Sequence, residues 1–274
     1  MLPRQSIRPT GTPAILFQNV DKTFSERGRQ QYAALRAFDL QIETNEIYCL
    51  LGPSGCGKST ALNLLAGFEA PTSGRILHLG TEVHGPGPER GVIFQGDDSL
   101  YPWLNAIENI EFGLRVKGMD AAERRTIADE YLDLVGLHGQ GHKYPRELSG
   151  GMRQRIQIAR VLANNPTTLL MDEPFAALDA QTRKIMQEEL VRIWQHEAKN
   201  VLFITHDIIE ALVLGDKIGV MRAGPGSAIR EEIRVDLPRP RDRTDPRLIE
   251  LYRHIDALVE QEVAASRKDR TLHA

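Results

Sequence analysis

Cysteine is scarce in this sequence of 274 residues, which contains only two. Cys49 and Cys56 have a spacing that fits neither a zinc site nor a redox pair. The sequence therefore excludes a disulfide-stapled secreted scaffold and a cysteine-rich metal domain. We expect Cys49 to be buried in a strand. Cys56 is expected to be a bystander in a loop, although its oxidation there could block the entry of a ligand.

Long apolar runs and a strong charge excess are also missing. No stretch approaches the roughly 18–20 apolar residues that span a bilayer, and residues 1–13 have no apolar signal core. The net charge of −3 gives no support for a protein that coats nucleic acid. Because 41% of the residues are hydrophobic, a substantial core can form. We expect a soluble, reduced, cytoplasmic globular protein.

What the sequence does contain is a glycine-rich run, GPSGCGKST at residues 52–60, between an apolar segment and a helical pattern. It fits G-x-x-x-x-G-K-[ST] in the strand–loop–helix setting of a phosphate-binding P-loop. Glycines let successive N–H groups point at phosphate oxygens, and the helix start adds positive potential. We expect Lys58 to reach the β- and γ-phosphates and Ser59 to ligate Mg²⁺. A glycine-rich turn before a core helix is the alternative. The predicted nucleotide-binding residues of this run are Gly52, Pro53, Ser54, Gly55, Cys56, Gly57, Lys58, Ser59 and Thr60.

Two adjacent carboxylates, Asp172 and Glu173, follow a short apolar run at residues 168–171. A carboxylate at the end of a strand beside a P-loop is well placed to ligate Mg²⁺, which predicts this role for Asp172. Hydrolysis also needs a base that orients and deprotonates water, and Glu173 is the candidate. Acidic pairs are usually plain surface residues, so the prediction depends on their position downstream of the P-loop.

Apolar periodicity divides the rest of the chain. Strands are predicted at 14–20, 38–42, 47–51, 75–79, 91–95, 168–171, 201–205, 217–221 and 228–235. Helices are predicted within 101–145 and at 181–198, 208–214 and 248–263. Residues 25–34 are expected to form a polar loop. The expected domains are a loose lead-in at 1–13, a main domain at 14–236 with a helical subdomain at about 100–160, and a Pro/Arg linker with a terminal helix at 237–274.

The run LSGGMRQR at residues 148–155 resembles the signature motif of ABC-type ATPases. Five further motifs occur in that family's order: the P-loop, Gln95 after a strand, LLMDEP, Ala177-Leu178-Asp179, and His206 after a strand. The resemblance covers residues 14–235. It implies an α/β fold with a P-loop NTPase core of ABC type, an antiparallel β subdomain and an α-helical signature subdomain. It also implies ATP and Mg²⁺ as the ligands.

The resemblance assigns a role to each matching residue. Gln95 would contact Mg²⁺ and the attacking water, and His206 would bond the γ-phosphate. Phe24 would stack on adenine, with Tyr32 as the alternative. The implied catalytic residues are Lys58, Gln95, Glu173 and His206, and the implied metal ligands are Ser59, Gln95 and Asp172.

The signature residues Ser149, Gly150 and Gly151 precede a helix, so they can form a second anion site. In the family, this site faces the γ-phosphate that the other ATPase subunit holds. The resemblance therefore implies a head-to-tail homodimer that sandwiches two ATP molecules, with Asp179 in the loop that crosses between the subunits. ATP would close the dimer, and hydrolysis would reopen it.

The resemblance also implies membrane partners. A separate permease would contact the insert at 101–145, and a solute-binding protein would act through the permease, which places this chain on the cytoplasmic face of the inner membrane. The aromatic run 101–104 could link the nucleotide to the permease; alternatively, Trp103 packs inside the insert. The stretches HGPGPERGVIFQ and VDLPRPRDRTDP resemble the ATPases of nitrate, sulfonate and taurine importers, the taurine type above all. No nucleic-acid partner is implied.

Several alternatives stay open. An exporter ATPase shares the same motifs. A soluble ABC ATPase acting on DNA or the ribosome would carry coiled-coil insertions or two cassettes, and a non-hydrolysing module would lack the catalytic residues. The basic segment 237–247 could be a lipid or nucleic-acid patch, although its prolines and aspartates favour a solvated linker. The terminal helix is expected to dock on its own domain, with a regulatory or dimer contact as the alternative.

Overall fold

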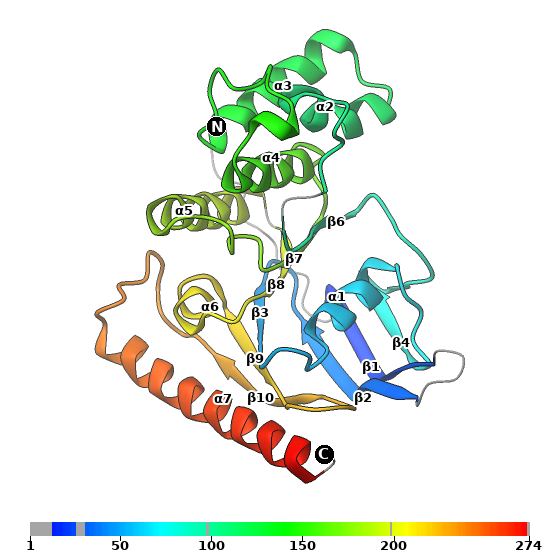
Figure 1. The fold of residues 1–274 in the computed structure, drawn as a ribbon, viewed down its shortest axis with the longest axis vertical. Coiled ribbons are helices and arrows are strands. Elements are labelled where there is room, and N and C mark those ends of the chain that lie inside the picture. The colour runs from blue at the N-terminus through cyan, green and yellow to red at the C-terminus, as the bar shows by residue number, and fades with distance from the viewer. Residues whose placement is uncertain (1–12, 26–30, 97–98, 198, 273–274) are drawn as a thin grey trace. The chain divides into compact units, whose positions relative to one another are not determined.

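The chain divides into two units in a computed structural model that describes residues 13–25, 31–96, 99–197 and 199–272 (Figure 1). The first unit combines the described residues up to Gly87 with those after position 198, and the second runs from Pro88 to Glu197. Residues 1–12 of the predicted lead-in lie outside the described ranges. None of the helices in these ranges combines the length and apolar character needed to cross a bilayer.

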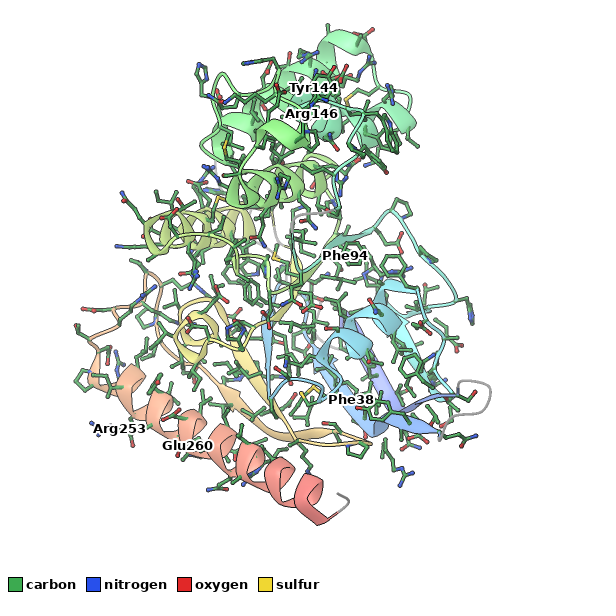
Figure 2. The ribbon with its side chains drawn as sticks, viewed as in Figure 1. Phe38, Phe94, Tyr144, Arg146, Arg253 and Glu260 are labelled. Atoms are coloured by element: carbon green, nitrogen blue, oxygen red, sulfur yellow. The ribbon has the colours of Figure 1, made fainter. Side chains whose placement is uncertain are left out.

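The first unit contains an antiparallel sheet with the order β2-β1-β4-β5. Its strands are β1 (Ile15–Phe24), β2 (Tyr32–Ile42), β4 (Ser73–His78) and β5 (Thr81–Glu82). β2 begins inside the polar loop predicted at 25–34. Phe38 (labelled in Figure 2) is buried and meets Phe17 edge-on, with ring centroids 5.4 Å apart. The β1–β2 register pairs Phe24 with Tyr32, so the two candidates for adenine stacking are neighbours across one ladder.

A second group of strands in the first unit has the order β10-β9-β3-β8. They are β3 (Ile47–Leu51), β8 (Asn200–Ile204), β9 (Lys217–Met221) and β10 (Ile229–Arg234). β3 is parallel to β8 and β9, and all its residues are buried, which confirms the central strand predicted from its apolar run. Because β3 and β8 are parallel, the P-loop and His206 follow at the same edge of the sheet.

The helices of the first unit are α1 (Lys58–Ala66), α6 (Ile208–Leu214) and α7 (Pro246–Leu272). The helix α7 lies along β10 in Figure 1 and extends beyond the predicted 248–263. It buries Leu248, Ile255 and Leu258, a spacing that places all three on one face. The expected docking of this helix on its own unit is therefore confirmed.

Most of the segment between β10 and α7 is exposed, as expected of the solvated linker predicted at 237–247, but two of its arginines are held by hydrogen bonds. Arg239 donates to Asp216 Oδ1 at 2.6 Å. Arg241 donates to the carbonyl oxygens of Leu212 at 2.8 Å and Gly215 at 2.5 Å. Burial, helped by the neighbouring Arg239, lowers the pKa of Arg241 to about 10, so it is charged at neutral pH. Both arginines donate hydrogen bonds to carbonyl groups at the end of α6, Arg239 to that of Leu214. Because they are held there, these two side chains do not belong to an exposed basic patch.

The second unit contains the parallel strands β6 (Arg90–Ile93) and β7 (Thr168–Asp172). Its helices are α2 (Ala106–Val116), α3 (Ala121–Leu134), the 3₁₀ turn η1 (Pro145–Glu147), α4 (Gly150–Ala163) and α5 (Ala180–Glu197). α2, α3 and α4 pack against one another. α2 starts with a capping box in which Asn105 and Glu108 each accept from the other's backbone N–H, which fixes its first turn.

Within this unit Trp103 does not fill the core of the helical insert, because 69% of it is exposed. Tyr101 packs there instead. Its ring centroid is 4.5 Å from that of Phe112, and the guanidinium of Arg160 lies 5.4 Å from it. The alternative prediction that Trp103 packs inside the insert is therefore wrong.

Candidate nucleotide-binding and catalytic site

The P-loop curls because two of its glycines have left-handed backbone angles. Gly55 has a φ of 81° and Gly57 a φ of 94°. Gly57 directly precedes α1, and no side chain caps that helix start. The first N–H groups of α1 therefore have no partner within the helix and can bind an anion. A Cβ on Gly57 would lie 2.8 Å from Leu35 Cδ2, so the loop also requires glycine for space.

Lys58 is the buried cation of this loop, with 8% of its surface exposed. Its ammonium donates to the carbonyl oxygens of Gly52 at 2.7 Å and Pro53 at 3.0 Å. These bonds hold the charge on the inner side of the curled loop. A buried ammonium that donates to neutral carbonyl oxygens is electrostatically suited to a phosphate.

Cys56 shares this environment. Its Sγ lies 3.9 Å from Lys58 Nζ and 4.0 Å from Met221 Sδ. Burial raises the pKa of the Cys56 thiol more than Lys58 lowers it. The thiol is therefore neutral and buried, which agrees with the bystander role predicted for it. Cys49 is fully buried in β3, as predicted.

Both base-stacking candidates present exposed rings, 37% for Phe24 and 45% for Tyr32. The ammonium of Lys22 lies 4.7 Å from the ring centroid of Phe24. Tyr32 is tied to the P-loop, because its hydroxyl donates to the carbonyl oxygen of Gly55 at 3.1 Å. The hydroxyl of Tyr32 thus stabilises the P-loop. Phe24 lies at the end of β1, and its exposed aromatic ring is suited to stacking on a base.

His206 is exposed directly after β8, between two residues that are fixed by hydrogen bonds. The Thr205 hydroxyl donates to buried Glu210 at 2.5 Å and accepts from Asp207 N at 3.1 Å. Asp207 in turn caps α6 by accepting from Glu210 N at 3.1 Å. This closed set of bonds fixes the backbone on both sides of His206.

In the second unit, the carboxylates predicted from the sequence end β7. Glu173 has a φ of 46°, a left-handed conformation that is unfavourable for a residue with a Cβ. Gln95 Nε2 donates to Glu173 Oε2 at 3.1 Å. Two residues distant in the sequence, both predicted to be catalytic, are therefore brought into contact. Such strain is common where a side chain must be aimed for function.

Two buried glutamines of α4 hold the loops around this pair. Gln154 accepts from Ala177 N at 3.0 Å, and its Nε2 lies 3.4 Å from the carbonyl oxygen of Glu173. Gln157 donates to the carbonyl oxygen of Phe94 at 3.3 Å, next to Gln95 (Phe94 is labelled in Figure 2). Both glutamines are completely buried. Their contacts were not predicted from the sequence, although amides on the apolar face of a helix require partners and so give a usable signal.

The signature residues begin α4 as predicted. Ser149 is the N-cap and accepts from Met152 N at 3.3 Å. A Cβ on Gly151 would lie 3.3 Å from the carbonyl oxygen of Ala177, so the signature and the loop after β7 are in close contact. Asp179 caps α5 by accepting from Gln181 N and Thr182 N, and the bond from Thr182 N is the main cause of its lowered pKa. The sequence analysis did not foresee this capping role.

The predicted metal ligands are an oxygen-only set: the Ser59 hydroxyl, the Gln95 amide and the Asp172 carboxylate. Among the residues that the structure describes, no group of three or more His, Cys, Asp or Glu side chains could hold a metal. Gln95 donates through Nε2, so Oε1 is its atom available as a ligand. Mg²⁺ prefers a site in which a few protein oxygens are ligands and phosphate and water oxygens complete the coordination.

Comparisons with known proteins show the family and the fold of the chain. Residues 35–176 match the family described as ABC transporter. The chain is 47% identical over 251 residues to an uncharacterised ABC transporter ATP-binding protein, MJ0412 of Methanocaldococcus jannaschii, covering 92% of this chain and 93% of that protein. It is 48% identical over 220 residues to the nitrate import ATP-binding protein NrtD of Synechocystis sp., covering 79% and 82%.

A further relative is the bicarbonate transport ATP-binding protein CmpC of Synechococcus elongatus, 45% identical over 233 residues. That match covers 84% of this chain but 35% of the relative, so the chain spans about a third of its length. Among solved structures, the dimeric ATP-binding cassette MJ0796 bound to ADP and Pi has a TM-score of 0.74 at 32% identity, over 82% of this chain and all of that one. The chain thus has the ATP-binding cassette fold.

Proposed function

This chain belongs to the ABC transporter family and is an ATP-hydrolysing transporter subunit, and we propose that it energises the import of a small anion. Its similarity to the nitrate and bicarbonate relatives is the observation that carries the import proposal. An alkanesulfonate such as taurine is the other candidate, supported by the loops at 84–95 and 235–246. An exporter ATPase is the alternative function.

We further propose that these residues bind and hydrolyse ATP. Lys58 and the N–H groups of the P-loop would bind the phosphates, and His206 would bond the γ-phosphate. Glu173, aimed by its backbone and by Gln95, would accept the proton of the attacking water. When bound through Ser59, Gln95 and Asp172, Mg²⁺ would supply charge neutralisation at the phosphates.

Two such chains are proposed to act head to tail, with Ser149, Gly150 and Gly151 of one facing the ATP of the other. The dimeric form of the similar cassette supports this arrangement. A membrane permease is the proposed partner, and it would hold this subunit peripherally at the cytoplasmic face. The exposed ring of Trp103 supports a permease contact on the unit that carries Gln95.

Anion uptake tests the proposal. In cells lacking this gene, uptake of labelled nitrate, bicarbonate and taurine is compared after complementation with the wild type or with Glu173→Gln. We expect the wild type, but not the variant, to restore uptake of one anion. Normal uptake of all three in the deletion strain, together with an efflux defect, would identify an exporter instead.

A further inference from the structure

The helix α7 is connected to the turn between β9 and β10 by the carboxylate of Glu262. Glu262 has a side chain that is 13% exposed. Its Oε2 accepts from Ala223 N at 2.7 Å, and its Oε1 accepts from Arg230 Nη1 at 2.6 Å. This carboxylate therefore bonds both the start of the turn, residues 222–228, and the strand that follows it, where Arg230 also donates to Gln261 and to the carbonyl oxygen of Leu258. Hydrogen bonds that involve a charged partner are the strong ones.

The turn is joined to β2 by backbone hydrogen bonds. Gly226 N donates to the carbonyl oxygen of Ala33 at 2.6 Å, and Ser227 N donates to that of Ala34 at 3.2 Å. Arg36 N donates back to the carbonyl oxygen of Ser227 at 3.3 Å. Ser227 is buried, and its hydroxyl closes the turn on itself by donating to the carbonyl oxygen of Arg222 at 2.6 Å. The turn and the first half of β2 are thus one hydrogen-bonded piece.

This piece supports the P-loop from two directions. From β2, Leu35 lies against Gly57 so closely that no Cβ fits between them. From β9, Met221 is the residue before the turn, and a Cβ on Gly52 would lie 3.0 Å from its Cβ. Its Sδ is also 4.0 Å from Cys56 Sγ. The turn and β2 are thus connected to the P-loop through the packed side chains of Met221 and Leu35.

We propose that Glu262 is a positioning residue for ATP binding: it holds the 222–228 turn, which holds the P-loop in its phosphate-binding curve. The carboxylate of Glu262 bonds Ala223 and Arg230, so its effect on the P-loop would pass through the turn and β2. The inference requires only that the chain binds ATP, and it is independent of the transported solute. A purely structural role would lower the melting temperature without changing the affinity for ATP.

The test uses the purified full-length chain and ATP as the probe. For Glu262→Ala we expect the KM for ATP to rise about three- to tenfold, within the range that indirect coupling produces, while kcat stays within about twofold. Glu262→Gln keeps an oxygen that can accept from Ala223 N, and we expect its KM to stay within about twofold of the wild type. Glu260→Ala is the matched control, since Glu260 is exposed on the same helix (Figure 2).

Three results overturn the proposal: an unchanged KM in Glu262→Ala, an equal rise in Glu260→Ala, or a Gln variant as weak as the Ala variant. If Glu262→Ala does not fold, Ala223→Pro removes the N–H that Glu262 holds in the turn and must raise KM more than about twofold. A smaller change then overturns the proposal. Wild-type ATP hydrolysis in the same assay separates these results from a failure of the proposed function.

Discussion

Replacing Gly57 with alanine tests two reasons why the P-loop requires glycine at this position. The residue has a left-handed backbone angle, and it has no space for a Cβ. The φ of 94° costs a residue with a Cβ about 1–2 kcal/mol. The new Cβ would also lie 2.8 Å from Leu35 Cδ2 and 3.1 Å from the carbonyl oxygen of Ala34. Leu35 is fully buried, so relieving this overlap costs about 1–3 kcal/mol. The lower chain entropy of unfolded alanine offsets about 0.4–1 kcal/mol, which leaves a net loss of about 1–5 kcal/mol.

Gly55 provides the matched control in the same loop. It has a similar φ of 81°, but a Cβ there would meet nothing within 4 Å. Gly55→Ala should therefore lose only the backbone term, about 1 kcal/mol. The difference between the two variants measures the packing of β2 against the P-loop without the contribution of the backbone angle.

The assay is urea denaturation without nucleotide, in which unfolding is monitored by far-ultraviolet circular dichroism. Tryptophan fluorescence is unsuitable, because Trp103 and Trp194 both lie in the second unit, whereas the P-loop lies in the first. We expect the free energy of unfolding of Gly57→Ala to be lower than that of Gly55→Ala by about 1–3 kcal/mol. Equal values for the two variants would refute the argument that Leu35 packs against the loop.

Three further substitutions test other parts of the site and fold. Glu173→Gln should retain ATP binding but slow single-turnover hydrolysis by roughly 10²–10⁴-fold and accumulate an ATP-bound dimer in gel filtration; an unchanged rate would remove Glu173 from its role as the base. Ser149→Arg should abolish turnover in a homodimer while each chain binds ATP with its normal Kd by calorimetry, and loss of binding would contradict the role of Ser149 in the partner's site. Arg241→Ala should lower the free energy of unfolding by roughly 2–3 kcal/mol, because the carbonyl groups at the end of α6 lose a charged donor; exposed Arg243→Ala is its control and should change little.

Elements with a strong local signal could be predicted from the sequence. The apolar run of β3, the alternation in β2 and the glycines of the P-loop act over a few neighbouring residues, and the structure contains all three, although β2 begins earlier than predicted. The linker is mostly exposed, as predicted, but the contacts of two of its arginines were not predicted, for a physical reason. Prolines, charges and aspartates usually indicate solvent, but at positions 239 and 241 the arginines find carbonyl groups at a helix end that is distant in the sequence.

The candidate site also combines features that could be predicted from the sequence with features that could not. Motif order alone identified Lys58, Gln95, Glu173 and His206 as candidates, because each lies in a short pattern that requires its residue type. That Gln95 bonds Glu173, and that Gln154 fixes the backbone behind it, are facts of tertiary packing. No local pattern encodes them, since each bond joins segments that only the folded chain brings together.

The sequence by itself thus determined the phosphate-binding loop, the catalytic candidates and the parallel strand at the centre of the first unit. Only the tertiary structure decided what supports them: β2 and the 222–228 turn beside the P-loop, and Glu262 of α7 behind that turn. The reason is the range of the interactions. A glycine's backbone angle is a local property, whereas the space and hydrogen bonds around it depend on residues as far away as the terminal helix.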